Sequence, residues 1–161
     1  RPTSDRTRET LFSMLLSRLG TFEDLRVADL FAGSGALGLE ALSRGAATCL
    51  FVEQDAAAVR ALRRNITNLR AQERCDVRAT SVLAMGSVRG EPLDLVLLDP
   101  PYDTGAGCVA IDKLTRLGWI APSAWISLET SKKEDVSVKG YVTEVTRDVG
   151  KARLHLLRRE D

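Results

Sequence analysis

The stretch Asp29-Leu-Phe-Ala-Gly33-Ser-Gly35-Ala-Leu-Gly38 decides the fold of this sequence. The short apolar run 26–31 that leads into it is predicted to form a strand. Residues 36–44 are predicted to form a helix that ends at Gly45. Glycines spaced as G-x-G-x-x-G permit a tight turn and let a ligand approach the backbone closely. A strand, a glycine loop and a helix in this order are common to dinucleotide-binding enzymes and methyltransferases, so the loop alone does not separate the two classes.

The rest of the chain continues this alternation of strands and helices. Strands are predicted at 48–53, 76–81, 93–99 and 124–129, and helices at 5–19, 55–70 and 107–117. Two final runs, 141–149 and 152–158, are predicted to form an antiparallel hairpin. The pattern predicts one α/β domain over residues 1–161, with an open, mostly parallel seven-stranded sheet and helices on both faces. Ligands of such sheets bind at the carboxyl ends of the strands.

Composition excludes several classes of protein. The 161 residues suit one hydrophobic core, and the net charge of +1 gives no overall indication of a nucleic-acid partner. No window approaches the ~18 apolar residues of a membrane span, and no signal peptide is evident. Cys49, Cys75 and Cys108 lack C-x-x-C spacing, which favours reduced thiols and a cytoplasmic protein. The single histidine, His155, is expected to be structural, so we predict no metal site and, by default, a monomer.

Carboxylates follow the first two predicted strands. Asp29 lies four residues before Gly33, where a carboxylate suits an amino-acid ammonium group better than a pyrophosphate. Glu53 follows the second strand, twenty residues beyond Gly33, and can accept both ribose hydroxyls of a nucleoside. Because NAD and S-adenosylmethionine both carry a ribose, Glu53 does not distinguish them. Asp55 is expected to cap the next helix.

The fourth predicted strand ends in the tetrapeptide Asp99-Pro100-Pro101-Tyr102. Two prolines stiffen the chain and remove two donors, so the Asp99 carboxylate and the Pro100 carbonyl project as fixed acceptors. An exocyclic amine has two N–H donors in one plane, and holding both directs its lone pair at a methyl sulfonium carbon. Tyr102 supplies a flat face for a base. The tetrapeptide therefore favours methylation of a base amine and has no use in a dehydrogenase.

These residues together resemble the class I S-adenosylmethionine-dependent methyltransferases, and D-P-P-Y resembles their amino-methylating branch. Two longer blocks, Arg1-Pro-Thr-Ser-Asp5-Arg6-Thr-Arg8-Glu9-Thr-Leu-Phe12 and residues 29–44, are similar to the bacterial 16S rRNA guanine-N2 methyltransferase family (the RsmD family). The resemblance covers essentially the whole chain. It implies a Rossmann-like class I methyltransferase fold. It also implies metal-free methyl transfer to guanine N2 of 16S rRNA, within the 30S subunit or a late assembly intermediate.

By position, the resemblance implies three groups of site residues. The methyl donor would be bound by Thr3, Arg6, Glu9, Asp29, Phe31, Ala32, Gly33, Gly35, Gly38, Glu53, Gln54, Ser81, Val82 and Asp99. The catalytic residues that hold the base would be Asp99, Pro100, Pro101 and Tyr102. The RNA would be contacted by Arg1, Arg6 and Arg8, with ion pairs to Asp5 and Glu9 as the alternative use of these arginines. Asp29 and the glycines would line the methionine end, and helix 5–19 would close the site.

Two features depart from the family pattern. Ser81-Val82 stands where family members usually carry Asn or Asp near the adenine amine, so a backbone amide is the alternative adenine contact. Family members also begin with a basic segment upstream of R-P-T. This sequence is expected to lack that segment and to bind RNA more weakly.

Three alternatives to the guanine assignment stay open at this stage. The same chemistry could act on adenine N6 or cytosine N4 of DNA, which D-P-P-Y equally permits. The chain could be a nicotinamide-dependent oxidoreductase, although that leaves D-P-P-Y unexplained and offers only Tyr102 and His155 as proton donors. It could also be a non-catalytic RNA-binding assembly factor.

Overall fold

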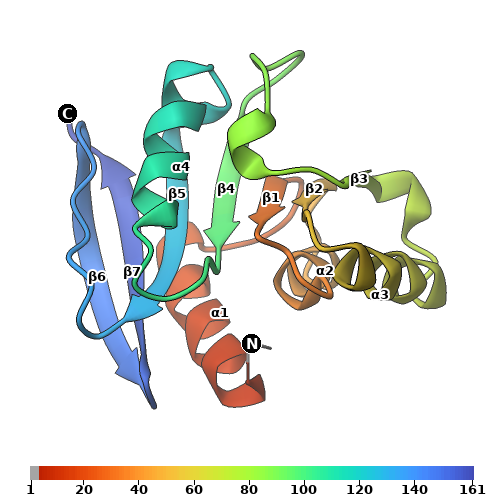
Figure 1. Cartoon of the computed structure of the whole chain (residues 1–161), viewed down its shortest axis with the longest axis horizontal. Helices are drawn as coiled ribbons and strands as arrows, with labels where there is room; N and C mark the ends of the chain where they lie inside the picture. The colour runs from red at the N-terminus through yellow and green to blue at the C-terminus, as the bar shows by residue number, and fades with distance from the viewer. Residues whose placement is uncertain (1–3) are drawn as a thin grey trace.

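A seven-stranded sheet forms the centre of the molecule in a computed structural model that describes residues 4–161 (Figure 1). The strands are β1 (Arg26–Leu30), β2 (Thr48–Val52), β3 (Cys75–Arg78), β4 (Leu93–Leu98), β5 (Ile120–Ser131), β6 (Tyr141–Val149) and β7 (Ala152–Arg159). Their order is β3-β2-β1-β4-β5-β7-β6. The first five run parallel, whereas β7 is antiparallel to both β5 and β6. This arrangement confirms the predicted mostly parallel sheet with a closing antiparallel hairpin.

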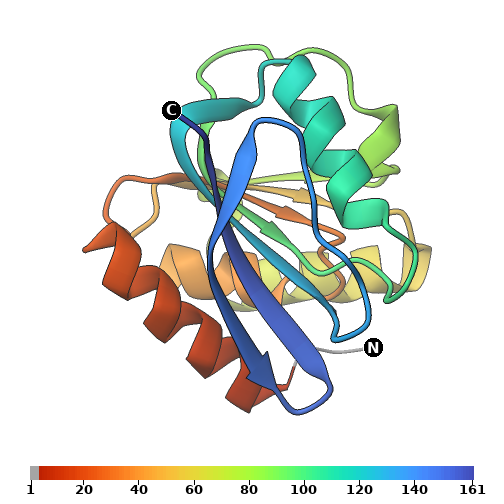
Figure 2. The same ribbon diagram turned by 90° about the vertical axis from the view of Figure 1, so that its left-hand side faces the viewer.

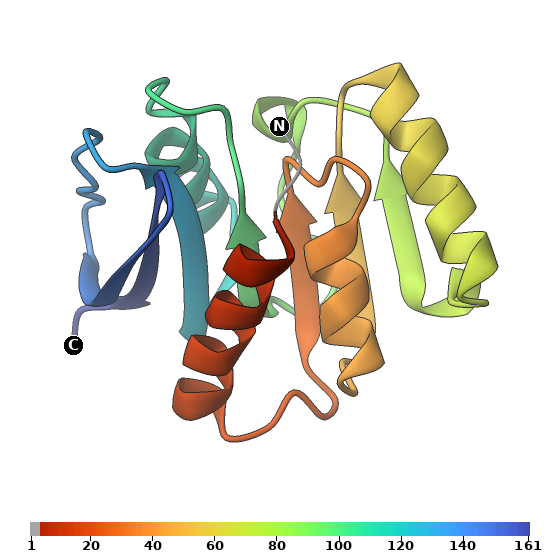
Figure 3. The ribbon, with the colours of Figure 1, turned by 90° about the horizontal axis from the view of Figure 1, so that it is seen from below.

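Helices cover both faces of the sheet, as predicted. Three of them, α1 (Asp5–Leu19), α2 (Ala36–Ser43) and α3 (Ala56–Asn68), lie on one face, and α4 (Ala106–Arg116) lies on the other (Figures 2 and 3). Two short 3-10 helices, η1 (Gln72–Arg74) and η2 (Val82–Ala84), lie before and after β3, and η2 packs against α4. Each face has its own core. Phe12, Phe51 and Leu62 belong to the α1–α3 side, and Ile111 and Leu114 belong to the α4 side.

Local sequence signals explain where the first helix begins and ends. Ser4 caps α1, because its hydroxyl accepts a hydrogen bond from the Thr7 amide at 3.1 Å. At the other end Gly20 has a φ of 77°, and its amide donates to the Leu16 carbonyl at 2.9 Å. The bounds 5–19 expected from the sequence are therefore correct. Asp55 likewise caps α3 by accepting from the Ala58 amide at 2.9 Å.

Two strands differ from their predicted bounds by more than one residue. β3 ends at Arg78 instead of Ser81, because Ser81 caps η2 through a 3.2 Å bond from the Leu83 amide. β5 begins at Ile120, which pairs with Leu93, and continues to Ser131, so it is twice as long as the predicted run 124–129. This length carries β5 past the end of β4, to the edge of the sheet where ligands bind in such folds.

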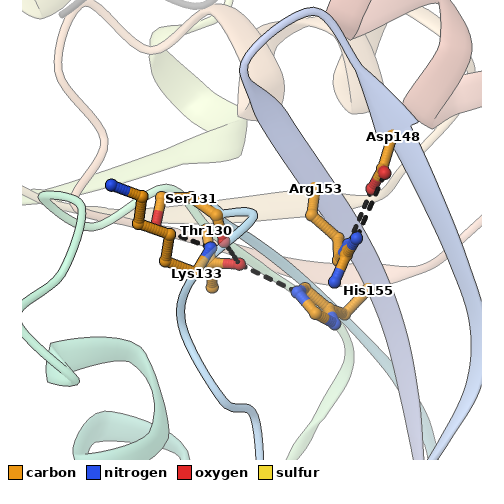
Figure 4. A network of polar contacts seen from close by, with 6 residues as sticks. All are labelled: Thr130, Ser131, Lys133, Asp148, Arg153 and His155. Atoms are coloured by element: carbon orange, nitrogen blue, oxygen red, sulfur yellow. Dashed lines mark hydrogen bonds and ion pairs between the residues drawn. The ribbon is translucent and has the colours of Figure 1, made fainter.

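His155 on β7 occupies a structural position against the end of β5, as expected (Figure 4). Its side chain is buried, and its Nε2 lies 2.9 Å from the Thr130 hydroxyl, which also donates to the Ser131 carbonyl at 2.8 Å. A hydroxyl has one hydrogen, so Nε2 must be the donor to Thr130. Burial lowers the pKa of His155, with the nearby Arg153 acting in the same direction. The neutral ring therefore fastens β7 to β5.

The three cysteines are free, and Cys49 is buried. Among residues 4–161, no helix has the length and apolarity that crossing a membrane requires. The same part of the chain contains no cluster of three His, Cys, Asp or Glu side chains arranged to hold a metal ion.

Candidate active site

A cavity of about 730 Å³ opens at the carboxyl ends of β1, β2 and β4. Its position is where the strand order reverses between β1 and β4, the usual ligand site of open α/β sheets. The predicted residues that line it are Asp29, Phe31, Ala32, Gly33, Glu53, Gln54, Ser81, Val82, Asp99, Pro100, Pro101 and Tyr102. The other lining residues, which the sequence did not assign to the site, are Ser34, Ala36, Leu37, Val52, Asp55, Ala58, Thr80, Leu83, Thr104 and Ala106.

The glycine loop turns sharply out of β1 and exposes its backbone to the cavity. Phe31, Gly33 and Gly35 all have positive φ, at 60°, 57° and 86°. A Cβ on Gly33 would meet no atom within 4 Å, so the space beside this residue is open to a ligand. The amide of Ala32 donates to the Val52 carbonyl at 3.0 Å, which ties the loop to the end of β2.

Gly35 and Gly38 do not line the cavity, in contrast to the prediction that they border the methionine end of a ligand. A Cβ on Gly38 would lie 2.7 Å from the Cys49 sulfur and 2.8 Å from Cζ of Phe51, and a Cβ on Gly35 would collide with Leu62. Both glycines therefore let α2 approach the strands and α3 closely. The two glycines thereby fix the position of the loop relative to β2 and α3.

Asp29 is buried and accepts a hydrogen bond from a backbone amide. Its side chain is 1 % exposed, and its Oδ2 accepts a 2.9 Å hydrogen bond from the Gly38 amide. Burial raises the pKa of Asp29 well above its ordinary 3.8, the Gly38 amide counteracts this, and the carboxylates of Asp99 and Glu53 raise it further. Three carboxylates thus border one cavity, and this arrangement favours a cationic ligand.

Glu53 is held rigidly at the end of β2. Its Oε1 accepts from the Gly33 amide at 2.7 Å, and its Oε2 accepts from the Asp55 amide at 2.9 Å. An ionised carboxylate has about four lone-pair positions, so both oxygens retain acceptor capacity toward the cavity. The two backbone bonds fix the direction of that capacity and link Glu53 to the glycine loop.

The tetrapeptide Asp99–Tyr102 forms the opposite side of the cavity, directly after β4. Asp99 and Tyr102 are half-buried, and Pro100 is buried. The Tyr102 hydroxyl donates to Oε2 of Glu129 on β5 at 2.8 Å. Sequence reasoning missed Glu129, although a carboxylate at the end of the apolar run 124–129 was a signal that could have identified it.

The residues after β3 form an apolar wall. The Ser81 hydroxyl is engaged as the cap of η2, whereas Val82 is buried and Leu83 is 47 % exposed. Lys113 of α4 donates to the Leu83 carbonyl and holds this turn in place. This end of the cavity is therefore lined by η2, whose Val82 and Leu83 are apolar and whose cap is the Ser81 hydroxyl.

Only some of the site residues predicted in the N-terminal region lie within the described part of the chain. Thr3 and Arg1 lie outside the described residues. Arg6 and Glu9 are exposed on α1 and do not line the cavity. Arg8 forms ion pairs with Asp5 at 3.2 Å and with Glu40 of α2 at 3.4 Å. The alternative prediction of ion pairs on the helix surface therefore applies to Arg8, although its second partner is Glu40 and not Glu9.

The strand order, the glycine loop, the carboxylate after β2 and the D-P-P-Y segment after β4 define the fold as that of a class I methyltransferase. Comparison with known proteins specifies the family. The chain belongs to the family described as Conserved hypothetical protein 95, which matches residues 1–158.

Individual relatives agree with this family. The chain is similar to Ribosomal RNA small subunit methyltransferase D of Escherichia coli K12, at 40 % identity over 130 residues. The match covers 81 % of this chain and 64 % of that protein, so the chain spans less than two thirds of this relative. A solved structure of the Escherichia coli protein YhhF, described as a candidate methyltransferase, has 33 % identity and a TM-score of 0.84. It covers 98 % of this chain and 88 % of its own. An RNA methyltransferase from Salinibacter ruber, solved with S-adenosyl-L-homocysteine, shares the fold at a TM-score of 0.71 and 16 % identity, over 100 % and 95 % of the two chains.

Proposed function

We propose that this chain transfers a methyl group from S-adenosylmethionine to the exocyclic N2 amine of a guanine in 16S rRNA of the small ribosomal subunit. The observation that carries the proposal is one cavity lined on one side by the glycine loop and Glu53 and on the other by Asp99–Tyr102. The E. coli relative, by its name a methyltransferase of small-subunit ribosomal RNA, supports the choice of substrate.

The residues present fit S-adenosylmethionine. This molecule carries a sulfonium and an ammonium group, and the buried Asp29 with its neighbouring carboxylates offers the complementary charge. Glu53 offers a fixed carboxylate to ribose hydroxyls, and Val82 and Leu83 offer apolar surface to a purine ring. The methyl donor, when bound, supplies an electrophilic methyl carbon.

The chain's own groups would orient the amine that attacks this carbon. The Asp99 carboxylate and the Pro100 carbonyl would each accept one N–H of the guanine amine, which leaves the nitrogen lone pair directed into the cavity. The Tyr102 ring would stack on the base, which has to leave its own stack to enter. The contribution of these residues is positioning and electrostatic stabilisation.

Methyl transfer to unmodified 30S subunits and to free 16S RNA, with mass spectrometry of the nucleosides, tests the proposal. We expect N2-methylguanosine, whereas N6-methyladenosine or N4-methylcytidine would contradict the choice of base. Asp99→Ala should lower kcat at least a hundredfold, which is about the effect of losing one transition-state hydrogen bond, and should leave S-adenosylmethionine binding largely intact. Asp112→Ala, which removes a carboxylate paired with Arg116 on α4, is the matched control.

RNA contacts of the chain are proposed for Arg6 rather than Arg8. Arg6 is exposed at the start of α1, whereas two carboxylates already pair with Arg8. Arg6→Gln should weaken rRNA binding and reduce its dependence on salt concentration, because each phosphate contact releases a counterion. Binding with an unchanged salt dependence would exclude this contact.

A further inference from the structure

The carboxylate of Glu129 lies at a position where a sheet of this kind usually carries an apolar side chain. Glu129 is 6 % exposed near the end of β5, and the preceding Ile126 and Leu128 are buried apolar residues. It pairs with Leu154 of β7, and the register of β4 with β5 (Leu98 with Leu128) brings it beside Asp99. Burying a carboxylate is unfavourable unless hydrogen bonds compensate it. The stability of the sheet alone therefore does not explain a carboxylate at position 129.

The hydrogen bond from Tyr102 supplies a reason for this carboxylate. The Tyr102 hydroxyl donates to Oε2 of Glu129 at 2.8 Å, the usual distance of an O–H···O hydrogen bond. The ring of a tyrosine has only two side-chain torsions, so a fixed hydroxyl leaves the ring little freedom to tilt. The direction of the Tyr102 face is thus set by a residue of the neighbouring strand.

Further bonds from the end of β5 hold the residues that follow Tyr102. The Ser131 hydroxyl donates to Oδ1 of Asp103 at 2.5 Å, and the Gly105 amide donates to Oε1 of Glu134 at 3.3 Å. Asp103 has a φ of 60°, a left-handed conformation that aspartate tolerates better than most residues. Figure 4 shows Ser131 beside the Thr130–His155 contact, which anchors this end of β5 to β7.

We propose that Glu129 is a positioning residue that orients the Tyr102 ring against the base. The inference rests on the proposed function, because it concerns the same cavity. It adds a residue that does not line the cavity and acts through another side chain. The carboxylate acts on the loop through the hydrogen bond that it accepts from Tyr102.

A comparison of Glu129→Gln with Glu129→Ala tests the proposal, since glutamine retains an acceptor for the tyrosine hydroxyl. We expect Glu129→Ala to lower kcat about tenfold and to change KM for S-adenosylmethionine less than about twofold, as for loss of an orienting contact. Glu129→Gln should stay within about threefold of the wild-type kcat. In a Tyr102→Phe background the alanine change should lower kcat clearly less than it does in the wild type, because both substitutions remove the bond between the two side chains. Glu144→Ala on the exposed strand β6 is the matched control.

A second measurement is independent of catalysis. The chain has two tyrosines, Tyr102 and Tyr141, so NMR of ring-labelled tyrosine gives two sets of signals that Tyr141→Phe assigns. Glu129→Ala should shift the Tyr102 signals and leave those of Tyr141 in place. Unchanged Tyr102 signals, a wild-type kcat in Glu129→Ala, or losses that multiply in the double variant would each overturn the proposal. An inactive wild-type chain would instead count against the proposed function, and the NMR result would still decide the role of Glu129.

Discussion

Replacing Gly38 with alanine should destabilise the protein, although alanine favours helices. Gly38 is the third residue of α2 and has no positive φ, so the backbone itself accepts alanine. Helix propensity alone would stabilise the variant by about 0.5–1 kcal/mol. The opposing term is steric. The new methyl group would lie 2.7 Å from the Cys49 sulfur and 2.8 Å from Cζ of Phe51, and it would collide with Cε1 of the same ring, whereas carbon atoms in favourable contact lie roughly 3.5–4.0 Å apart.

The steric term is the larger one, because neither neighbour can yield. Cys49 is 1 % exposed and Phe51 is 0 % exposed, and both lie on a central strand beneath α2. Overpacking a filled core costs about 1–3 kcal/mol, and rigid neighbours place this site at the upper end. After subtraction of the helix-propensity gain, the free energy of unfolding should fall by about 2 kcal/mol. For a domain of this size that corresponds to a Tm roughly 4–8 °C lower.

Urea unfolding followed by tryptophan fluorescence measures this change. Gly86→Ala is the control, because a Cβ there meets no atom within 4 Å, and its stability should stay within about 0.5 kcal/mol of the wild type. Relief of the clash would push α2 away from β2 and stretch the Gly38–Asp29 bond, so the affinity for S-adenosylmethionine should fall as well. A Gly38→Ala variant as stable as the wild type would refute the packing account of the glycine loop.

Three further predictions concern titratable groups. Asp29→Asn keeps an acceptor for the Gly38 amide and removes a carboxyl group whose pKa is raised by burial. The free energy of unfolding at neutral pH, measured by urea unfolding, should therefore rise by about 0.5–2 kcal/mol. Titration calorimetry should show weaker binding of S-adenosylmethionine. A less stable variant, or one that binds S-adenosylmethionine as tightly as the wild type, would contradict this role. Glu53→Ala removes the acceptor for Gly33 and Asp55, so Kd for S-adenosylmethionine should rise about 10- to 100-fold, and an unchanged Kd excludes its role. His155 has a pKa that burial lowers, so the unfolded chain takes up its proton first and stability declines as pH falls below about 6.5. Urea unfolding of His155→Asn should show a smaller loss of stability as the pH falls below about 6.5, and an identical decline in both proteins would contradict this contribution of His155.

Much of the fold could be predicted from the sequence because its signals are local. The capping residues Ser4 and Asp55 and the terminating Gly20 lie next to the helices they delimit. The start of β5 could not be predicted, because Ile120 enters the sheet only through its pairing with the distant Leu93. The end of β3 was placed too late, since the Ser81 hydroxyl prefers to cap a 3-10 turn.

The candidate site likewise has residues that local signals predict and residues whose role depends on distant contacts. Asp29, Glu53 and Asp99 each follow a predicted strand, and parallel strand ends meet at one edge, so their meeting could be predicted. Gly38 follows the glycine pattern equally well, yet only the packing of Phe51 shows that it serves close approach instead of lining the cavity. The pairing of Arg8 with Glu40 joins two helices, which no spacing within one helix reveals.

The pairing of β5 with β7 has a consequence for biosynthesis. A chain leaves the ribosome from its amino end, and domains form in that order as far as their contacts allow. The strands that carry Asp29 and Glu53 are made within the first third of the sequence, and β4 completes their neighbourhood soon afterwards. Glu129 faces Leu154, so the wall that holds Tyr102 is finished only when β7 has emerged. A nascent chain that is paused before β7 therefore carries the residues of both walls but lacks the strand that pairs with Glu129.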